Sequence, residues 1–281
     1  MSFIKILFAL FILPLSVFGS TDGISCKHFI LKDKTYVHFI EIDPAYFDLV
    51  LKEAEDEWAE TLETIATSEN AIAAINGGFF FTGGDKIFKP SGILKIGGNW
   101  QGFAFLPRGA IGWSNDGKKA LFDKLLTKIE NNGEISILPQ SSYTTKREWQ
   151  DAFYILGGAP LLIQNGKLIR DYSEEKTIAS FLTEKHPRSA VGVLENGHFI
   201  FLTVDGTRNF FFKNSGISIK DLAVLMQALG CKDALNLDGG GSSTLYFEGS
   251  IQNNPCGELL DKNRFRVRKI SNALLILPKQ F

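Results

Sequence analysis

The sequence SAVGVLENGHFIFLTV, residues 189–204, places two apolar runs on either side of Asn196-Gly197. Asn-Gly accepts the positive φ angles of a two-residue turn, and between apolar runs it is the strongest short-range signal for a β-hairpin. The same pattern recurs where residues 161–163 and 168–169 flank Asn165-Gly166. Both segments predict antiparallel strand pairs.

The rest of the chain adds more strands and few helices. Runs of β-branched, aromatic or other apolar residues predict strands at 35–42, 47–51, 71–75, 234–237, 244–247 and 273–277. Helical spacing predicts one helix at about 58–67, and another that Ser218 caps and Gly230 ends. Residues 109–143 are polar and predict no clear element. Hairpins with few helices indicate an α+β fold with a large twisted, mostly antiparallel or mixed sheet and a few flanking helices.

The composition is that of an ordinary globular protein. Of 281 residues, 44% are hydrophobic and 22% charged, which excludes a disordered or collagen-like chain. The formal net charge is −1, so no broad field attracts nucleic acid, and we expect no nucleic-acid partner. No linker divides the sequence, which favours a single domain over residues 20–281.

The first residues have the pattern of a secretory signal peptide. Lys5 precedes an apolar run at 6–13 and a stretch of mostly small residues at 16–20, which predicts a signal peptide over residues 1–19. The protein is therefore expected to be secreted or periplasmic. No later segment approaches about 18 continuous apolar residues, so we expect no stable membrane insertion.

Three cysteines remain after such cleavage, in a compartment that permits disulfides. Cys231 with Cys256 is the preferred pair, which leaves Cys26 over. The alternative is three independent thiols that pack as small apolar residues.

The most informative segment for chemistry is NLDGGGSST, residues 236–244. It supplies Asp238 at a strand end, then Gly239, Gly240 and Gly241, then Ser242 and Ser243. Glycines leave backbone N–H groups uncovered, and successive N–H groups form an anion-binding nest to which the serines add hydroxyl donors. The segment predicts a phosphate site, and the alternative is a Gly-Ser hairpin loop with no ligand.

Three further strand ends carry candidate residues. Asp205 follows an apolar strand and is a partner for Asp238, although Asp-Gly alone is a turn signal. Arg188, fixed by the preceding Pro187, suits a bidentate contact to phosphate, and a surface arginine is the alternative. Asn76-Gly77-Gly78 offers an amide for a sugar hydroxyl and a close backbone approach, and the alternative is a plain turn.

Together these segments resemble a known family. The blocks AINGGFF (74–80), GGAPLLI (157–163), PRSAVG (187–192), VDG (204–206) and NLDGGGSS (236–243) occur in the order found in the phosphodiester glycosidase family. The resemblance runs from about residue 70 to 277. It implies a hydrolase that cleaves a sugar-1-phosphodiester at the glycosidic bond and releases free sugar and a phosphomonoester, so the partner would be a phosphorylated sugar or glycan.

The residue types suit that reaction. Glycosidases use two carboxyl groups, here Asp205 and Asp238, while Arg188 and the 239–243 loop would stabilise the departing phosphate. No cofactor is required by this chemistry. One alternative is a phosphodiesterase that attacks phosphorus with a divalent cation held by the two aspartates. A second is a secreted protein that binds a glycan or sugar phosphate without turnover.

Overall fold

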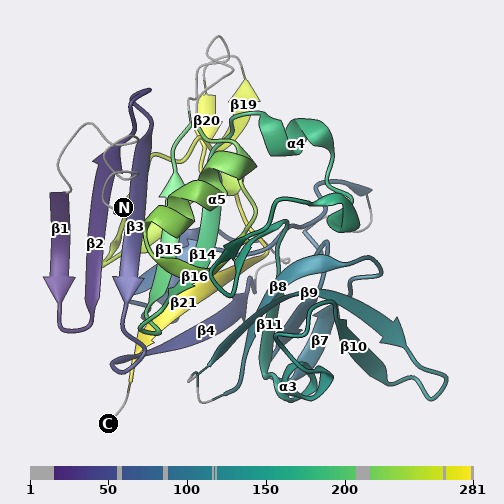
Figure 1. Ribbon diagram of the computed structural model, residues 1–281. Helices are drawn as coiled ribbons and strands as arrows, with labels where there is room; N and C mark the ends of the chain where they lie inside the picture. Colours follow the sequence, from purple (N-terminus) through teal and green to yellow (C-terminus); the bar gives the residue numbers. More distant parts are fainter. Residues whose placement is uncertain are drawn as a thin grey trace, which may run out of the picture.

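The computed structural model describes residues 16–55, 59–84, 88–115, 117, 119–206, 216–261 and 264–279. Their strands pair in antiparallel fashion in three large sheets and one small ribbon (Figure 1). The predicted α+β class, mostly antiparallel with few helices, is confirmed. The strands divide among three packed sheets where the sequence suggested a single large one.

The largest sheet contains both predicted hairpins. Its order is β1 (Ser16–Thr21), β2 (Ile24–Ile30), β3 (Tyr36–Ile42), β15 (Phe199–Val204), β14 (Arg188–Leu194), β16 (Cys231–Asn236), β12 (Leu161–Gln164) and β13 (Lys167–Leu168). The turns at Asn196-Gly197 and Asn165-Gly166 join β14 to β15 and β12 to β13, as their sequences predict.

Two smaller sheets pack against the large one. The six-stranded sheet has the order β10 (Ile135–Pro139), β9 (Ala120–Ile129), β8 (Arg108–Trp113), β11 (Tyr154–Gly157), β6 (Leu94–Ile96) and β7 (Asn99–Gly102). The five-stranded sheet has the order β18 (Ser250–Ile251), β17 (Leu245–Phe247), β5 (Ala73–Asn76), β21 (Asn272–Pro278) and β4 (Phe47–Glu53). The small ribbon pairs β19 (Glu258–Asp261) with β20 (Arg264–Arg266).

The described residues form four short helices. They are α2 (Leu62–Ser68), α3 (Lys146–Asp151), α4 (Ala179–Thr183) and α5 (Ile219–Ala228), with the 3₁₀ turns η2 (Ser173–Glu175) and η3 (Gly240–Ser242). The start of α5 agrees with the sequence, because Ser218 Oγ accepts a hydrogen bond from Asp221 N at 3.1 Å. The predicted 58–67 helix begins later, at Leu62, where Thr61 caps it.

One hydrophobic core joins all three sheets. It takes alternate residues from each, such as Phe201 of β15, Ile111 of β8 and Leu274 of β21. The other face of the large sheet packs against α5, which Figure 1 shows lying across β14, β15 and β16. α2 covers the five-stranded sheet, and Trp149 of α3 packs on the six-stranded sheet. The first layer is therefore α5 and the second is the eight-stranded sheet. The six-stranded and five-stranded sheets form the third layer, and α3 and α2 cover them.

Two predictions concern the chain ends and the cysteines. Residues 1–15 of the predicted signal peptide lie outside the described residues, and 16–19 belong to β1. The preferred Cys231–Cys256 disulfide is wrong, because both residues are thiols. Cys231 begins β16, whereas Cys256 precedes Gly257, whose carbonyl lies against Gly241 of the loop that follows the other end of that strand. Among the described residues, every helix is too short or too polar to cross a bilayer.

Gly158 marks where the chain passes from the six-stranded to the eight-stranded sheet. A Cβ atom there would lie 2.2 Å from Asn236 O, so the two backbones touch. We predict that Gly158→Ala lowers the free energy of unfolding by about 2 kcal/mol or more, measured by urea denaturation, because the strands must separate. Gly83→Ala is the control, since a Cβ there meets nothing within 4 Å. Equal stability of the two variants would contradict this close contact.

Candidate active site

Three adjacent strands of the large sheet end at one edge. Arg188 at the start of β14 pairs with Val204 at the end of β15, and Leu237 N on the other side donates to Ser189 O at 2.9 Å. Asp205 and Asp238 therefore leave the same edge on either side of β14, with their backbones two strand spacings, or about 10 Å, apart.

The Asn76 side chain ties this edge to the five-stranded sheet. It is fully buried, and Nδ2 donates to Asp238 O at 2.8 Å. Its Oδ1 accepts from Ser189 Oγ at 2.7 Å and from Thr244 N at 3.2 Å. With both ends of the amide occupied, Asn76 has no surface for the sugar hydroxyl that the sequence suggested. It positions Asp238 instead.

Gly77 and Gly78 allow the close approach that their sequence indicates. Gly77 O accepts a hydrogen bond from Asp238 N at 3.1 Å. A Cβ at Gly77 would lie 2.0 Å from Asn272 Oδ1, and one at Gly78 would lie 2.4 Å from Gly157 O. These contacts are with the protein's own backbone and side chains, so the two glycines bring Asp238 and the 157–159 segment together.

The glycine loop is more closed than the predicted nest. It folds into η3, where Ser242 N donates to Gly239 O at 3.1 Å and Ser243 N donates to Gly240 O at 3.3 Å. Gly240 N donates to Pro187 O at 2.9 Å. Most of its N–H groups thus serve the turn itself. The hydroxyls of Ser242 and Ser243 are buried and have no hydrogen-bond partner among the described residues, so they are the loop's unused donors.

Asp238 occupies an unusual position for a carboxyl group. Burial raises its pKa from 3.8 to about 6, although Arg268 and a hydrogen bond from Gly239 N oppose the shift. The Gly239 N to Asp238 Oδ1 distance is 2.9 Å. The Ser242 hydroxyl lies near the carboxylate but outside good hydrogen-bonding geometry. Such a carboxyl group can gain or lose a proton close to neutral pH.

Arg188 is buried, not open to a ligand. Arg188 is 1% exposed. Its Nη2 donates to Phe181 O and Glu184 O, and its Nε donates to Ile217 O at 3.2 Å. The guanidinium also lies 4.5 Å from the centroid of the Phe181 ring. Burial lowers the pKa of Arg188 to about 10. The side chain thus fixes the α4 segment against β14, and the phosphate contact suggested by the sequence has little room.

Asp205 lies at the same edge but faces another group of residues. Its carboxylate accepts from Asn253 Nδ2 at 3.2 Å and from Asn254 N at 3.1 Å, and it lies 3.3 Å from His38 Nε2. Asn253 Nδ2 also donates to Ser243 O at 3.0 Å. Asp205 is therefore linked to the glycine loop through Asn253.

Arg268 is a site residue that the sequence did not reveal. It is the cation beside Asp238, and its guanidinium lies 5.4 Å from the centroid of the Phe80 ring. A Cβ at Gly241 would lie 3.2 Å from Arg268 Cδ, so glycine admits the arginine to the loop. No motif surrounds Arg268 in the sequence, and only the packing of Gly257 and Arg268 against Gly241 of the loop reveals it.

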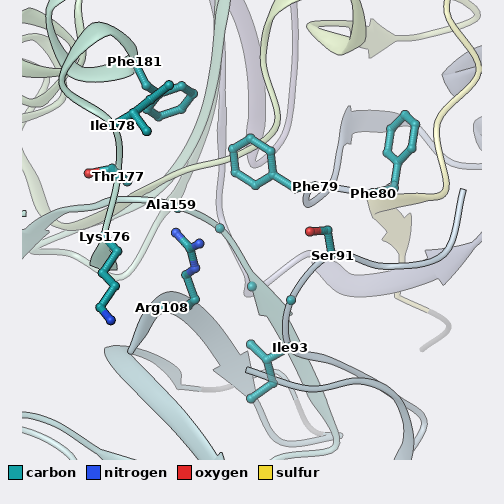
Figure 2. A pocket seen from close by; sticks show the side chains of 13 residues that line it. Phe79, Phe80, Ser91, Ile93, Arg108, Ala159, Lys176, Thr177, Ile178 and Phe181 are labelled. Carbon is teal, nitrogen blue, oxygen red and sulfur yellow. The ribbon is translucent and has the colours of Figure 1, made fainter. Parts of the chain in front are cut away.

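A pocket of about 300 Å³ adjoins this cluster (Figure 2). Phe79, Phe80 and Phe181 form aromatic walls, and Gly158 and Ala159 lie along its floor. The floor touches the end of β16, because Ala159 N donates to Asn236 O at 3.0 Å and Asn236 Nδ2 donates to Ala159 O at 2.6 Å. Two of the five sequence blocks, 74–80 and 157–163, therefore line the hollow, and the block 236–243 is hydrogen-bonded to its floor.

Comparisons with known proteins agree with this arrangement. The sequence model of the phosphodiester glycosidase family matches residues 69–277. The uncharacterized prophage-derived protein YomE of Bacillus subtilis (strain 168) is 26% identical over 225 residues, which are 79% of this chain and 31% of that protein. The N-acetylglucosamine-1-phosphodiester alpha-N-acetylglucosaminidase of Bos taurus is 27% identical over 131 residues, 43% of this chain and 24% of that enzyme.

A solved structure extends the likeness to the fold. The catalytic domain of the zebrafish N-acetylglucosamine-1-phosphodiester alpha-N-acetylglucosaminidase superposes with a TM-score of 0.65 at 18% identity, over 95% of this chain and 85% of that chain. The chain spans less than a third of the Bacillus and bovine proteins. Since the family match covers most of its length, the chain belongs to the phosphodiester glycosidase family.

Proposed function

We propose that this protein hydrolyses a sugar-1-phosphodiester between the anomeric carbon and the phosphate oxygen, releasing free sugar and a phosphomonoester. Membership of the family supports a glycosidase-type activity. The observation that carries the finer proposal is Asp238, a carboxyl group with a pKa of about 6 that is hydrogen-bonded to Asn76 and Gly77, in the segment that leads to the pocket wall at Phe79. A signal-peptide pattern over residues 1–19 supports action outside the cytoplasm.

Asp238 is proposed as the general base or nucleophile at the anomeric carbon. A phosphomonoester is a good leaving group, so the reaction depends less on an acid than on a carboxylate facing the positive charge that develops on the sugar. Arg268 and Ser242 lie beside Asp238, and they carry N–H and O–H donors for the departing phosphate or a sugar hydroxyl. Asp205 holds Asn253 against the loop, and Arg188 holds the α4 segment, so both act as positioning residues.

Hydrolysis in heavy-oxygen water tests the bond that breaks. A panel of hexose and N-acetylhexosamine 1-phosphodiesters is incubated with the enzyme, with and without a chelator, and the products are analysed by mass spectrometry. We expect the label on the sugar. Label on the phosphate would establish the phosphodiesterase alternative, with chelator sensitivity showing its cation. Binding without product from any diester would identify a non-catalytic sugar-phosphate-binding protein.

Replacing Asp238 by Asn removes the proposed base and keeps the shape of the side chain. We expect turnover to fall by about 10³-fold, within the usual range for a base of this kind. The folded state binds the Asp238 proton more tightly than the unfolded chain, so its ionised carboxylate destabilises the fold above pH 6. The variant should therefore be more stable at pH 7.5 by at most about 3 kcal/mol, a gain that vanishes near pH 4.

Asp233→Asn is the matched control for this variant. Asp233 lies near the other end of β16, and burial raises its pKa as well, but it accepts from Asn165 N far from the loop. Its replacement should leave turnover unchanged in a steady-state assay. Near-normal activity of the Asp238 variant, or equal losses in both variants, would remove the proposed role.

The pH profile of kcat/KM reports the ionisation of the free enzyme. Because Asp238 acts as a carboxylate and its pKa is about 6, we expect kcat/KM to fall about tenfold per pH unit below pH 6 and to be level above it. Initial rates at subsaturating substrate from pH 4.5 to 8 measure this limb. A rate that increases as the pH falls through 6 would mean that the protonated carboxyl acts.

A further inference from the structure

We propose that the pocket between Phe79, Phe181 and Arg108 is the subsite for the phosphoryl group of the substrate, with Arg108 and Lys176 as its ligands. The inference rests on the proposed function for the identity of the substrate, and on the structure for the anionic character of the group bound. It gives the phosphate role to cations that the sequence motifs do not contain.

The charge of the pocket is one-sided. Arg108 and Lys176 are the charged residues among the 13 that line it, and both are cationic. Figure 2 shows Arg108 extending into the hollow, with Lys176 to one side. Arg108 donates through Nη1 to Glu175 O at 2.8 Å, which leaves most of the guanidinium fork for a ligand. Lys176 is exposed and forms no ion pair with any described residue.

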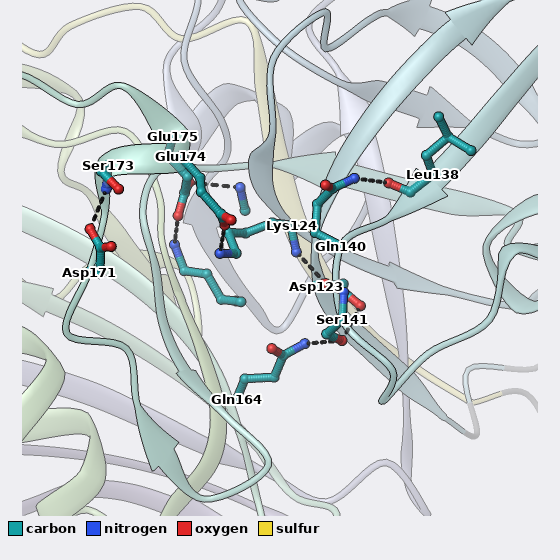
Figure 3. A network of polar contacts seen from close by, with 12 residues as sticks. Asp123, Lys124, Leu138, Gln140, Ser141, Gln164, Asp171, Ser173, Glu174 and Glu175 are labelled. Atoms are coloured by element: carbon teal, nitrogen blue, oxygen red, sulfur yellow. Dashed lines mark hydrogen bonds and ion pairs between the residues drawn. The ribbon is translucent and has the colours of Figure 1, made fainter.

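The turn η2, which Lys176 follows directly, is joined by hydrogen bonds to β8, where Arg108 lies (Figure 3). The Glu175 carboxylate is fully buried and accepts from Gly109 N at 2.8 Å and Leu161 N at 2.9 Å, so it connects η2 to β8 and to the start of β12. The neighbouring Glu174 pairs with Lys124. Because the Glu175 carboxylate faces the protein interior, it does not line the pocket. The Glu175 carbonyl accepts the hydrogen bond that holds Arg108 in position.

Other groups in the pocket suit a phosphate ester. Phe79 and Phe181 make an edge contact with their ring centroids 6.2 Å apart, which gives an apolar wall. Two cations and an aromatic wall match an anion attached to a carbon skeleton.

Two short segments connect Asp238 to the wall and the floor of the pocket. Gly77 O accepts from Asp238 N, and Phe79 follows two residues later, so one short segment leads from the carboxyl group to the pocket wall. On the floor, Ala159 pairs with Asn236, two residues before Asp238. Arg188, in contrast, uses its guanidinium on three backbone carbonyls behind Phe181. Arg108, with one guanidinium hydrogen bond to the described residues, offers more open donors to a phosphate in this pocket than Arg188 does.

Phenyl phosphate, a phosphomonoester with an apolar group, is the probe. Its dissociation constant is measured by calorimetry for wild type, Arg108→Gln, Arg108→Lys and Lys176→Gln. We expect Arg108→Gln to weaken binding on the order of tenfold to a hundredfold, as for loss of a charge-assisted bidentate contact. Arg108→Lys should restore part of it, and Lys176→Gln should weaken binding several-fold. Arg147→Gln is the control, because its side chain is 91% exposed on α3.

Kinetics separate this inference from the proposed function. With a diester that the enzyme hydrolyses, Arg108→Gln should raise both the KM and the inhibition constant of phenyl phosphate. The decrease in kcat/KM below pH 6, which we assign to Asp238, should remain. Binding that depends on Arg108 without any turnover would support the subsite and defeat the glycosidase. Turnover with unchanged phenyl phosphate affinity in both the Arg108 and Lys176 variants would overturn the subsite. Lys176 forms no ion pair with the part of the chain that the structure describes, so its variant tests the pocket even if Arg108→Gln unfolds.

Discussion

The buried amide of Asn76 is the contact on which the rest of the site depends. Asn76 lies at the end of β5 in the five-stranded sheet. Its side chain forms hydrogen bonds with Ser189 Oγ in β14, with Asp238 O after β16 and with Thr244 N before β17. Leaving a buried polar group unpaired costs about 1 to 3 kcal/mol. A movement of any of the three segments would break several of these hydrogen bonds at once, so the segments are held in a fixed relative position. Asp238 is thereby placed by backbone interactions and its carboxylate remains available.

Local rules in the sequence predicted the elements whose stability is local. The Asn-Gly hairpins and the Ser218 cap of α5 depend on neighbours within a few residues, and both are found. The region 109–143 failed the same rules, although it forms β8, β9 and β10. Its strands bury polar side chains such as Asp123, whose carboxylate is satisfied by Ser141 and Thr144. Only tertiary contacts make such a residue compatible with a core, so the alternating pattern is absent.

The candidate site was predicted in part for a similar reason. Spacing placed polar residues at strand ends, and the sheet topology brings Arg188, Asp205 and Asp238 to one edge. The spacing of residues in the sequence could not show which polar groups form hydrogen bonds within the protein and are therefore unavailable to a ligand. The amide of Asn76, the guanidinium of Arg188 and most N–H groups of the glycine loop bond internally, whereas Arg108 and Arg268 come from segments without a motif. The motif residues thus hold the segments of the site together, whereas Arg108 and Arg268, which lie outside the motifs, are available to contact a ligand.

The two kinds of arginine follow from the cost of burying charge. Arg188 has no carboxylate partner among the described residues, so its buried charge is compensated by the carbonyl oxygens of Phe181, Glu184 and Ile217, which accept from three of its five N–H donors. Arg108 makes one carbonyl contact to the described residues and faces a hollow free of acidic residues. An anion entering there gains charge-assisted hydrogen bonds without breaking internal ones. Affinity for phosphate should therefore come from Arg108, while the buried Arg188 holds the α4 segment in position.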